Sequence, residues 1–314
     1  MRWFVLVMIA FLTSGAHAAW PEQSVTLVVP YPPGGPIDQI GRQLAQRLQQ
    51  ATGKPFVVDN RSGAGGTIGS QQVLHAAADG HTLLLATTSS QVTVPQGMRK
   101  APYDGASDFT PITTLVRYPF LLVGKPNGPA TVNELIAAGK RKELNYGSFG
   151  IGAGNHLIAS YFAQRTGIRA LHVPYRGSGA TSAALMSGEI DFVFDSVQAV
   201  SGLISDGKLR AIAISSATRS SALPSVPTLQ ESGIVGFDEV IWVGLLGPKG
   251  IPLDVVQRIN KETNEFLADA AFRKRMESQG ATMMGGTADA FRSLVKSDQQ
   301  RWSRFMKENN IEIE

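Results

Sequence analysis

Hydrophobic positions along the chain follow two patterns in turn, short continuous runs and longer runs with helical spacing. The first short run covers 24–29, is rich in β-branched residues and ends at Pro30. In the next segment, large aliphatic residues recur at the spacing of one helix face: Ile37, Ile40, Leu44 and Leu48. This change from strand to helix recurs along most of the chain. It predicts an α/β protein with parallel-rich sheets flanked by helices.

The same patterns predict most of the remaining elements. Further strands are expected over 56–58, 82–86, 120–123, 144–146, 170–173, 192–194, 211–214 and 240–246. Helices are expected over 68–78 and 156–165, and beyond 246 the pattern is mostly helical. Thr131 and Glu134 form the T-x-x-E pattern of a capping box, which predicts that another helix begins there.

The strand and helix signals fall into two series, which predicts two lobes. The strands over 120–123 and 240–246 are candidates for the crossings between these lobes. We therefore expect one lobe to contain 19–120 together with 240–314, and the other to contain 121–239. A ligand cleft would lie between the two lobes.

The N-terminal segment over 1–18 has the pattern of a secretory signal peptide. Arg2 supplies a positive charge, residues 3–12 are apolar, and 16–18 (Ala-His-Ala) fit the A-x-A cleavage pattern. This apolar run is shorter than a membrane-spanning helix requires. We expect cleavage after Ala18, export of a soluble protein into a bacterial periplasm, and no membrane-embedded segment in the mature chain.

Composition and charge narrow the class of protein further. Hydrophobic residues make up 43% of the 314 residues and charged residues 17%, which favours a large apolar core over a disordered chain or a membrane bundle. The chain has no Cys, and its five His residues lack the spacing of metal ligands, so we expect no metal site and no cofactor. The net charge of +4 is scattered, which argues against a nucleic-acid partner.

Polar loops follow several predicted strands, at the edge where open α/β sheets bind ligands. These loops are rich in glycine or hydroxyl residues and cover 31–38, 87–90, 147–155, 174–179 and 195–196. Backbone N–H and hydroxyl donors with few fixed charges suit a carboxylate or another small oxyanion. Asp195 differs, because it would accept a hydrogen bond from the ligand. Phe149 and Trp242 are candidates to pack an apolar part of the ligand, although core packing is the favoured role for Trp242.

Motifs of common enzyme classes are absent from the sequence. It contains no G-x-G-x-x-G, P-loop, G-x-S-x-G or H-E-x-x-H pattern. His156 is expected as a first-turn helix residue beside the cleft rather than as a catalytic base. We therefore expect binding without catalysis. An exported enzyme acting on a small carboxylate or phosphate, and a ligand-sensing module for a signalling partner, stay as alternatives.

Several glycine-rich and proline-rich motifs occur in a characteristic order. They cover nearly the whole mature chain: 31–38 (YPPGGPID), 59–69 (DNRSGAGGTIG), 79–85 (DGHTLLL), 146–152 (YGSFGIG), 173–177 (VPYRG), 223–228 (LPSVPT) and 242–248 (WVGLLGP). In these motifs the chain resembles the periplasmic solute-binding proteins of tripartite tricarboxylate transporters, the Bug or TctC-like family. The resemblance implies a two-lobed, periplasmic-binding-protein-like fold of type II, a Venus flytrap. It further implies capture of a small organic carboxylate and its delivery to membrane permease subunits, and we expect a monomer.

The resemblance also implies which residues contact the ligand. They are backbone groups and side chains of the loops above: Tyr31, Gly34, Gly35, Asp38, Thr88, Ser89, Ser148, Gly152, Ala153, Asn155 and Asp195. Phe149 completes the predicted ligand site, and Asp195 would select the far end of the ligand. Many members of the family carry Ser or Thr at the position of Ala153, so one hydroxyl is missing here while the backbone donor is kept.

Overall fold

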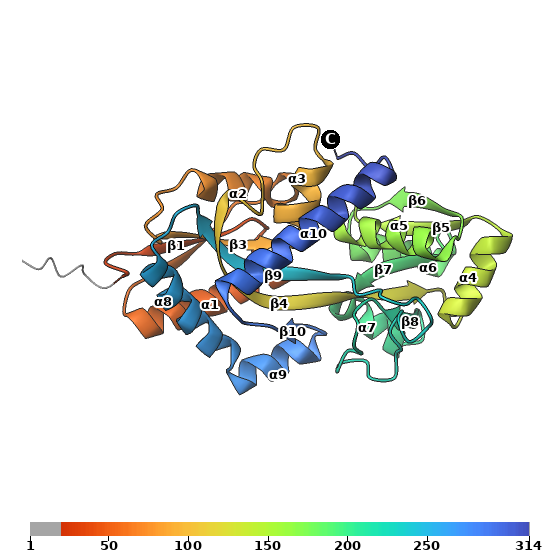
Figure 1. The fold of residues 1–314 in the computed structure, drawn as a ribbon. Coiled ribbons are helices and arrows are strands. Elements are labelled where there is room, and N and C mark those ends of the chain that lie inside the picture. Colours follow the sequence, from red (N-terminus) through yellow and green to blue (C-terminus); the bar gives the residue numbers. More distant parts are fainter. Residues whose placement is uncertain (1–19, 314) are drawn as a thin grey trace, which may run out of the picture.

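The computed structural model describes residues 20–313, so the predicted signal peptide over 1–18 lies outside the described residues. Within this range, ten strands form one sheet in the order β2-β1-β3-β9-β4-β7-β5-β6, with β10 and β8 also paired to β4 (Figure 1). The strands are β1 (Val25–Val29), β2 (Phe56–Asn60), β3 (Thr82–Thr87), β4 (Phe109–Gly124), β5 (Leu144–Ser148), β6 (Ala170–Pro174), β7 (Phe192–Ser196), β8 (Arg210–Ile214), β9 (Val240–Pro248) and β10 (Thr282–Met283).

Helices cover both faces of this sheet (Figure 1). The α-helices are α1 (Pro36–Thr52), α2 (Thr67–Leu74), α3 (Val94–Gly97), α4 (Val132–Arg141), α5 (Gly154–Thr166), α6 (Ser178–Ser187), α7 (Val197–Ser205), α8 (Leu253–Leu267), α9 (Ala270–Ser278) and α10 (Ala288–Glu308). Two short turns of other helical types, η1 (Ala64–Gly66) and η2 (Ser89–Thr93), lie in the loops after β2 and β3.

The long strand β4 joins two halves of the sheet. Its residues up to Pro119 pair with β9, whereas 120–124 pair with β7 and β8. We call the part with β1, β2, β3, β9, β10 and the start of β4 the first half, and the part with β5 to β8 and the end of β4 the second half. Figure 1 shows them at opposite ends of the molecule, with β4 and β9 running between them.

The outer strands are parallel and the crossing strands are antiparallel. β1 runs parallel to β2 and β3, and β5 runs parallel to β6 and β7. β4 and β9 run antiparallel to their neighbours. The predicted α/β fold with sheets flanked by helices is therefore confirmed. The sheet is mixed, and its antiparallel pairs mark the place where the chain passes between the halves.

Two local predictions from the sequence are confirmed in the helices. In α1, Ile40, Leu44 and Leu48 are fully buried against the sheet, as their helical spacing predicts. The hydroxyl of Thr131 accepts a hydrogen bond from the Glu134 N–H at 3.2 Å, so Thr131 is the N-cap of α4.

Two elements differ from the prediction by more than two residues at one end. The strand expected over 120–123 is only the end of β4, because Pro111 and Pro119 resemble strand breakers in the sequence. In the structure, Pro111 lies beside a register shift between β4 and β9, where the ladder tolerates it. The helix expected over 68–78 ends at Leu74, and the chain then turns through Gly80, whose φ of 85° favours glycine.

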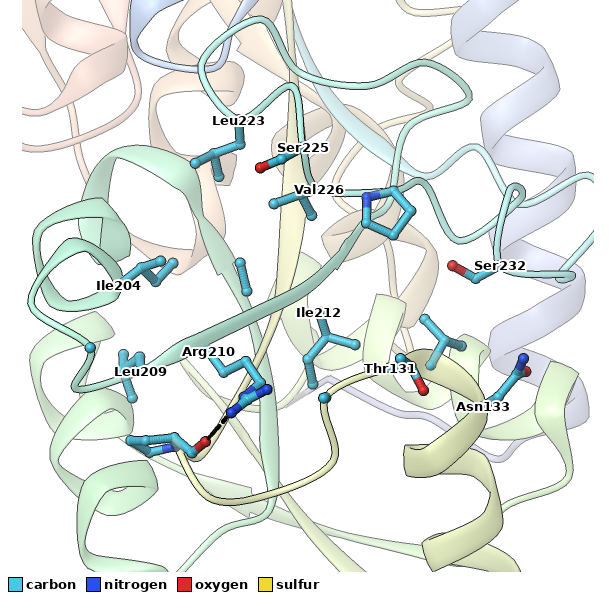
Figure 2. Close-up of a pocket in the computed structure, with 16 residues that line it drawn as sticks. Thr131, Asn133, Ile204, Leu209, Arg210, Ile212, Leu223, Ser225, Val226 and Ser232 are labelled. Carbon is cyan, nitrogen blue, oxygen red and sulfur yellow. Dashed lines mark hydrogen bonds between the residues drawn. The ribbon is translucent and has the colours of Figure 1, made fainter.

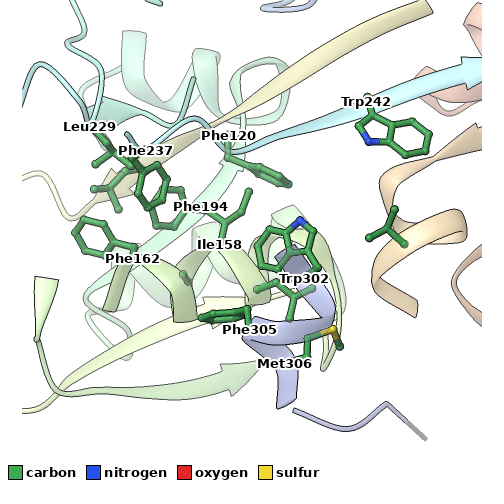
Figure 3. Close-up of a cluster of buried hydrophobic side chains, with 14 of the residues drawn as sticks. Phe120, Ile158, Phe162, Phe194, Leu229, Phe237, Trp242, Trp302, Phe305 and Met306 are labelled. Carbon is green, nitrogen blue, oxygen red and sulfur yellow. The ribbon is translucent and has the colours of Figure 1, made fainter. Parts of the chain in front are cut away.

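A large apolar cluster spans both halves and is bridged by α10. From the first half it includes Leu84, and from the second half Phe194, both fully buried. Trp302 and Phe305 of α10 contact the ring of Tyr161 in α5, with centroid distances of 6.2 and 5.4 Å. Figure 3 shows the α10 side chains packed against the second half, with Trp242 of β9 at the other side of the view. α10 therefore fixes both halves to one core.

This bridging role predicts the effect of truncating Trp302, which is 5% exposed. Replacing it with alanine leaves a cavity between α10 and the second half, so Trp302→Ala should lower the free energy of unfolding by about 3–5 kcal/mol in urea titrations. The exposed neighbour Arg304 is the matched control, and Arg304→Ala should change the stability by less than about 0.5 kcal/mol. Equal stabilities of the two variants would contradict the bridging role.

Candidate functional site

A cavity of about 190 Å³ lies where the two halves of the sheet meet. We call it the central cavity. Its floor comes from the crossing strands, with Tyr118 and Phe120 on β4 and Ile241 on β9. The complete lining is Pro36, Ile37, Tyr118, Pro119, Phe120, Phe149, Ser196, Val197, Gln198, Ile241, Gln279 and Gly280. None of these lining residues is charged.

Two helices from opposite halves begin at this cavity. Pro36 and Ile37 open α1, whose N-cap is Gly35, and Val197 and Gln198 open α7. The first turn of a helix leaves backbone N–H groups without intrahelical partners and carries the positive end of the helix dipole. Anions bind readily at such ends. The central cavity therefore combines two positive helix ends with an uncharged wall.

Asp38 organises the loop that leads into α1. Its side chain is 2% exposed and accepts hydrogen bonds from the Gly34 N–H at 2.8 Å, from Arg42 at 2.9 Å and from Asn60 at 2.9 Å. Burial alone would raise the pKa of Asp38, but these hydrogen bonds outweigh it and hold the pKa below its ordinary value. Asp38 is thus ionised and held by the loop, and it fixes Gly34 and the start of α1.

The predicted hydroxyl groups of the first half also hold neighbouring segments together. The Tyr31 hydroxyl lies 2.5 Å from the Thr87 hydroxyl oxygen, which joins the loop after β1 to the end of β3. Thr88 is buried, and its oxygen accepts the Trp242 backbone N–H at 3.0 Å. Ser89 donates to the Gly65 carbonyl at 3.5 Å. These contacts hold the loops after β1 and β3 in place, and none of these hydroxyl residues lines the central cavity.

The glycine-rich loop over 147–154 uses many of its amides internally. The Gly150 N–H donates to Ser148 at 3.1 Å, and the Gly152 N–H donates to His156 Nδ1 at 3.1 Å. The Ala153 N–H donates to the Gly150 carbonyl at 3.2 Å. The backbone donor expected at Ala153 is therefore engaged within the loop. The free amides at the site belong to the helix first turns rather than to this loop.

Hydrogen bonds from buried side chains also hold the loop over 147–154 in place. Asn155 is 1% exposed, and its Oδ1 accepts the Phe149 N–H at 3.1 Å. The fully buried Ser148 hydroxyl lies 2.5 Å from His172 Nε2. The rings of His156 and His172 contact each other with centroids 4.1 Å apart and planes tilted by 33°. The loop is thus preorganised, and Phe149 extends from it into the cavity lining.

Asp195 lies immediately before the N-cap of α7 and is fully buried. It accepts hydrogen bonds from the Ser178 hydroxyl at 2.6 Å and from the Ser196 N–H at 2.7 Å. Burial raises the pKa of Asp195 despite these hydrogen bonds. Its contacts orient the start of α7, and its selection of the far end of the ligand stays a prediction.

Some of the predicted site residues lie at or next to the central cavity, and others do not. Of the predicted residues only Phe149 lines it, while Gly35, Asp38 and Asp195 stand beside lining residues at the starts of α1 and α7. Trp242 is fully buried and donates to Asp298 at 2.8 Å, so it belongs to the core.

Sequence reasoning missed other residues of the lining. Tyr118, Ile241 and Gln279 come from segments far apart in the sequence, and no local motif marks them. The Tyr118 hydroxyl and Asn155 Nδ2 are buried without a hydrogen-bond partner among the described residues. Buried polar atoms without partners are rare in proteins, and a ligand is one way to satisfy them.

A second, larger pocket of about 660 Å³ lies on the surface of the second half (Figure 2). Its lining includes Thr131, Arg210 and Val226, and the Arg210 side chain donates to the Pro126 carbonyl at 2.6 Å. All of its lining residues lie between 126 and 232. A ligand in this pocket would not contact both halves, so the central cavity is the stronger candidate site.

Within residues 20–313, no group of His, Asp or Glu side chains is arranged to hold a metal ion. None of the helices in this range combines the length and the apolar character that a membrane crossing requires.

Known proteins with similar structures and sequences show first the fold class and then the family of this chain. Solved structures with the same fold are periplasmic binding proteins and transporters. A family model described as "Tripartite tricarboxylate transporter family receptor" matches residues 40–311, and the chain belongs to this family. The protein BugT of Bordetella pertussis is 33% identical, with 99% of this chain and 98% of BugT covered.

Two relatives have been solved with small carboxylates. A protein of R. palustris with adipate is 32% identical, covers 93% of this chain and 99% of its own, and has a TM-score of 0.80. MatC of Rhodopseudomonas palustris with bound malate is 28% identical, covers 91% of this chain and 99% of its own, and has a TM-score of 0.75.

The buried histidine behind the glycine-rich loop predicts a pH dependence of stability. Burial and the nearby His172 lower the pKa of His156 to about 4. As the pH falls below about 6.5, the unfolded chain binds a proton that the folded protein does not, so stability is lost. Between about pH 7 and about pH 4.5, the unfolding free energy of the wild type should fall by about 2 kcal/mol more than that of His156→Gln.

The control for this measurement is His75→Gln, because His75 is exposed in the folded protein. This variant should follow the wild-type curve of stability against pH. If His156→Gln also followed the wild-type curve, His156 would not be the neutral acceptor that holds Gly152.

Proposed function

We propose that the protein is a receptor that captures a small organic carboxylate in the central cavity and delivers it to the permease subunits of a tripartite transporter. The observation that carries this proposal is the start of two helices, from opposite halves, at one cavity whose lining is uncharged. Membership of the receptor family supports it, as do the adipate and malate in two relatives.

The binding step would be closure of two lobes over the ligand. We propose that the lobes are 19–120 with 240–314 and 121–239, which places the crossings at β4 and before β9. A ligand that contacts α1 and α7 at once is bound more tightly when the lobes are shut, so it shifts the population toward the closed form. Closure also removes water from the helix ends, which strengthens their hydrogen bonds to the carboxylate.

We propose that no bond is made or broken in the ligand. The Ser148 hydroxyl and His172 lie within hydrogen-bonding distance, as a nucleophile and its base would. Ser148, however, is fully buried and accepts the Gly150 N–H, so its oxygen faces the loop rather than the cavity. These contacts support a structural role for the pair.

We further propose a periplasmic location after removal of a signal peptide. Cleavage after Ala18 would leave Trp20 near the new N-terminus, packed against Phe56 with ring centroids 6.1 Å apart. The mature protein would act as a monomer that carries its ligand to the permease, without binding nucleic acid.

Ligand binding can be measured as stabilisation against heat. In a screen of mono-, di- and tricarboxylates, a ligand at about 100 times its Kd should stabilise the folded protein by about 2.7 kcal/mol. The amides of the successful acids are the control, and they should have little effect because they lack the negative charge. If no acid in a broad panel raised the Tm, the protein would not be a carboxylate receptor.

Gly35 allows a direct test of the helix end of α1. Its φ of −74° suits any residue, and a Cβ there would meet only the Pro32 carbonyl oxygen at 3.8 Å, so a side chain fits. Asp and Asn are both favoured N-cap residues. Gly35→Asp should weaken carboxylate binding at least about tenfold, because its charge repels the ligand and its side chain can cap the N–H groups that the ligand would use. Gly35→Asn can cap the same N–H groups but carries no charge, so it should weaken binding less than Gly35→Asp in calorimetric titrations. A Gly35→Asp variant with wild-type affinity would remove α1 from the binding site.

A further inference from the structure

The wall of the central cavity is apolar, and this property narrows the ligand class within the proposed function. We infer that the protein selects carboxylates whose body is an aromatic ring or an aliphatic chain, and that it rejects carboxylates with several hydroxyl groups. This inference rests on the proposed function, because it assumes that the central cavity holds the carboxylate. Apolar side chains from both halves face the cavity, among them Ile37, Phe120, Phe149, Val197 and Ile241.

Phe149 is the clearest sign that an apolar ligand covers this wall. Its side chain is 39% exposed although it is a large aromatic residue in the cavity lining. The loop around it is held rigidly, since its own N–H donates to Asn155 at 3.1 Å. An exposed aromatic ring on a preorganised loop gains from burial against apolar ligand atoms.

The volume and the few polar groups agree with this ligand class. An apolar cavity of about 150 Å³ is known to take up benzene, so the 190 Å³ here has room for one ring or a short chain. Polar side chains in the lining are limited to Tyr118, Ser196, Gln198 and Gln279. The Tyr118 hydroxyl is buried without a partner among the described residues, so it can serve one polar atom of the ligand.

A chain of hydroxyl groups would fit this cavity poorly. Each hydroxyl that loses its water and finds no partner weakens binding, and the apolar wall formed by Ile37, Phe149 and Val197 offers none. Several such groups in one ligand would lower its affinity well beyond tenfold. The carboxylate itself is served by the starts of α1 and α7.

Matched pairs of acids test this selectivity at constant charge and chain length. Hexanoate is compared with gluconate, and adipate with galactarate, by calorimetric titration of the mature protein. In at least one pair the unsubstituted acid should bind, and its affinity should exceed that of the hydroxylated partner at least about tenfold. If gluconate or galactarate bound as tightly as its partner, the inference would be overturned while the receptor function stood. If no carboxylate bound in these pairs or in the broad panel, the receptor function itself would fail.

A pair of isosteric variants locates the selectivity in the cavity wall. Val197 is 4% exposed and lines the cavity, so Val197→Thr adds a hydroxyl there at nearly constant volume. This variant should bind the preferred acid several-fold more weakly, and thermal unfolding checks that it is folded. Val57 on β2 is 53% exposed, and Val57→Thr should leave the affinity unchanged. Equal affinity of Val197→Thr and the wild type would contradict an apolar contact at this wall.

Discussion

Both halves of the sheet hydrogen-bond to the single strand β4, and this shared strand determines where a ligand can bind. In the first half, β1 leads through a glycine turn into α1, and in the second half, β7 leads directly into α7. Because both halves are anchored to β4, the two helix starts line the same cavity, with Tyr118 and Phe120 of β4 between them. α10 packs against both halves and keeps this arrangement compact.

None of the described residues that line the central cavity is charged, so under the proposed function helix ends, rather than a cation, would attract the ligand. Asp38 and Asp195 each lie beside one helix start, but both are buried and hydrogen-bonded to their own loops. Arg42, four residues after Asp38, is paired with it at 2.9 Å. Arg117, which directly precedes the cavity-lining part of β4, is paired with Asp238 at 3.6 Å. In the proposed closed form, the attraction would come from the peptide dipoles and free N–H groups of α1 and α7, whose interactions strengthen when water is excluded.

Much of the fold could be predicted because it is encoded in local patterns, such as the buried stripe of Ile40 and Leu44 and the cap at Thr131. The first part of β4 could not be predicted, because proline disfavours strands. Only the pairing of Pro111 with β9 in the structure shows that the strand continues there. The site was harder to predict, because it depends on long-range packing. Of the predicted site residues only Phe149 lines the central cavity. Packing between distant segments decides that Tyr118 lines the cavity and that the Gly152 amide is engaged by His156.

The most direct test of carboxylate binding at the helix ends is a crystal structure of the mature protein with a carboxylate that raises its Tm. We expect carboxylate oxygens in the central cavity, at about 2.7–3.2 Å from backbone N–H groups in the first turn of α1 or α7. We also expect that no Lys or Arg side chain contacts them and that the body of the ligand packs against Phe149. A carboxylate bound in the surface pocket beside Arg210, or held by a cationic side chain, would contradict binding at the helix ends.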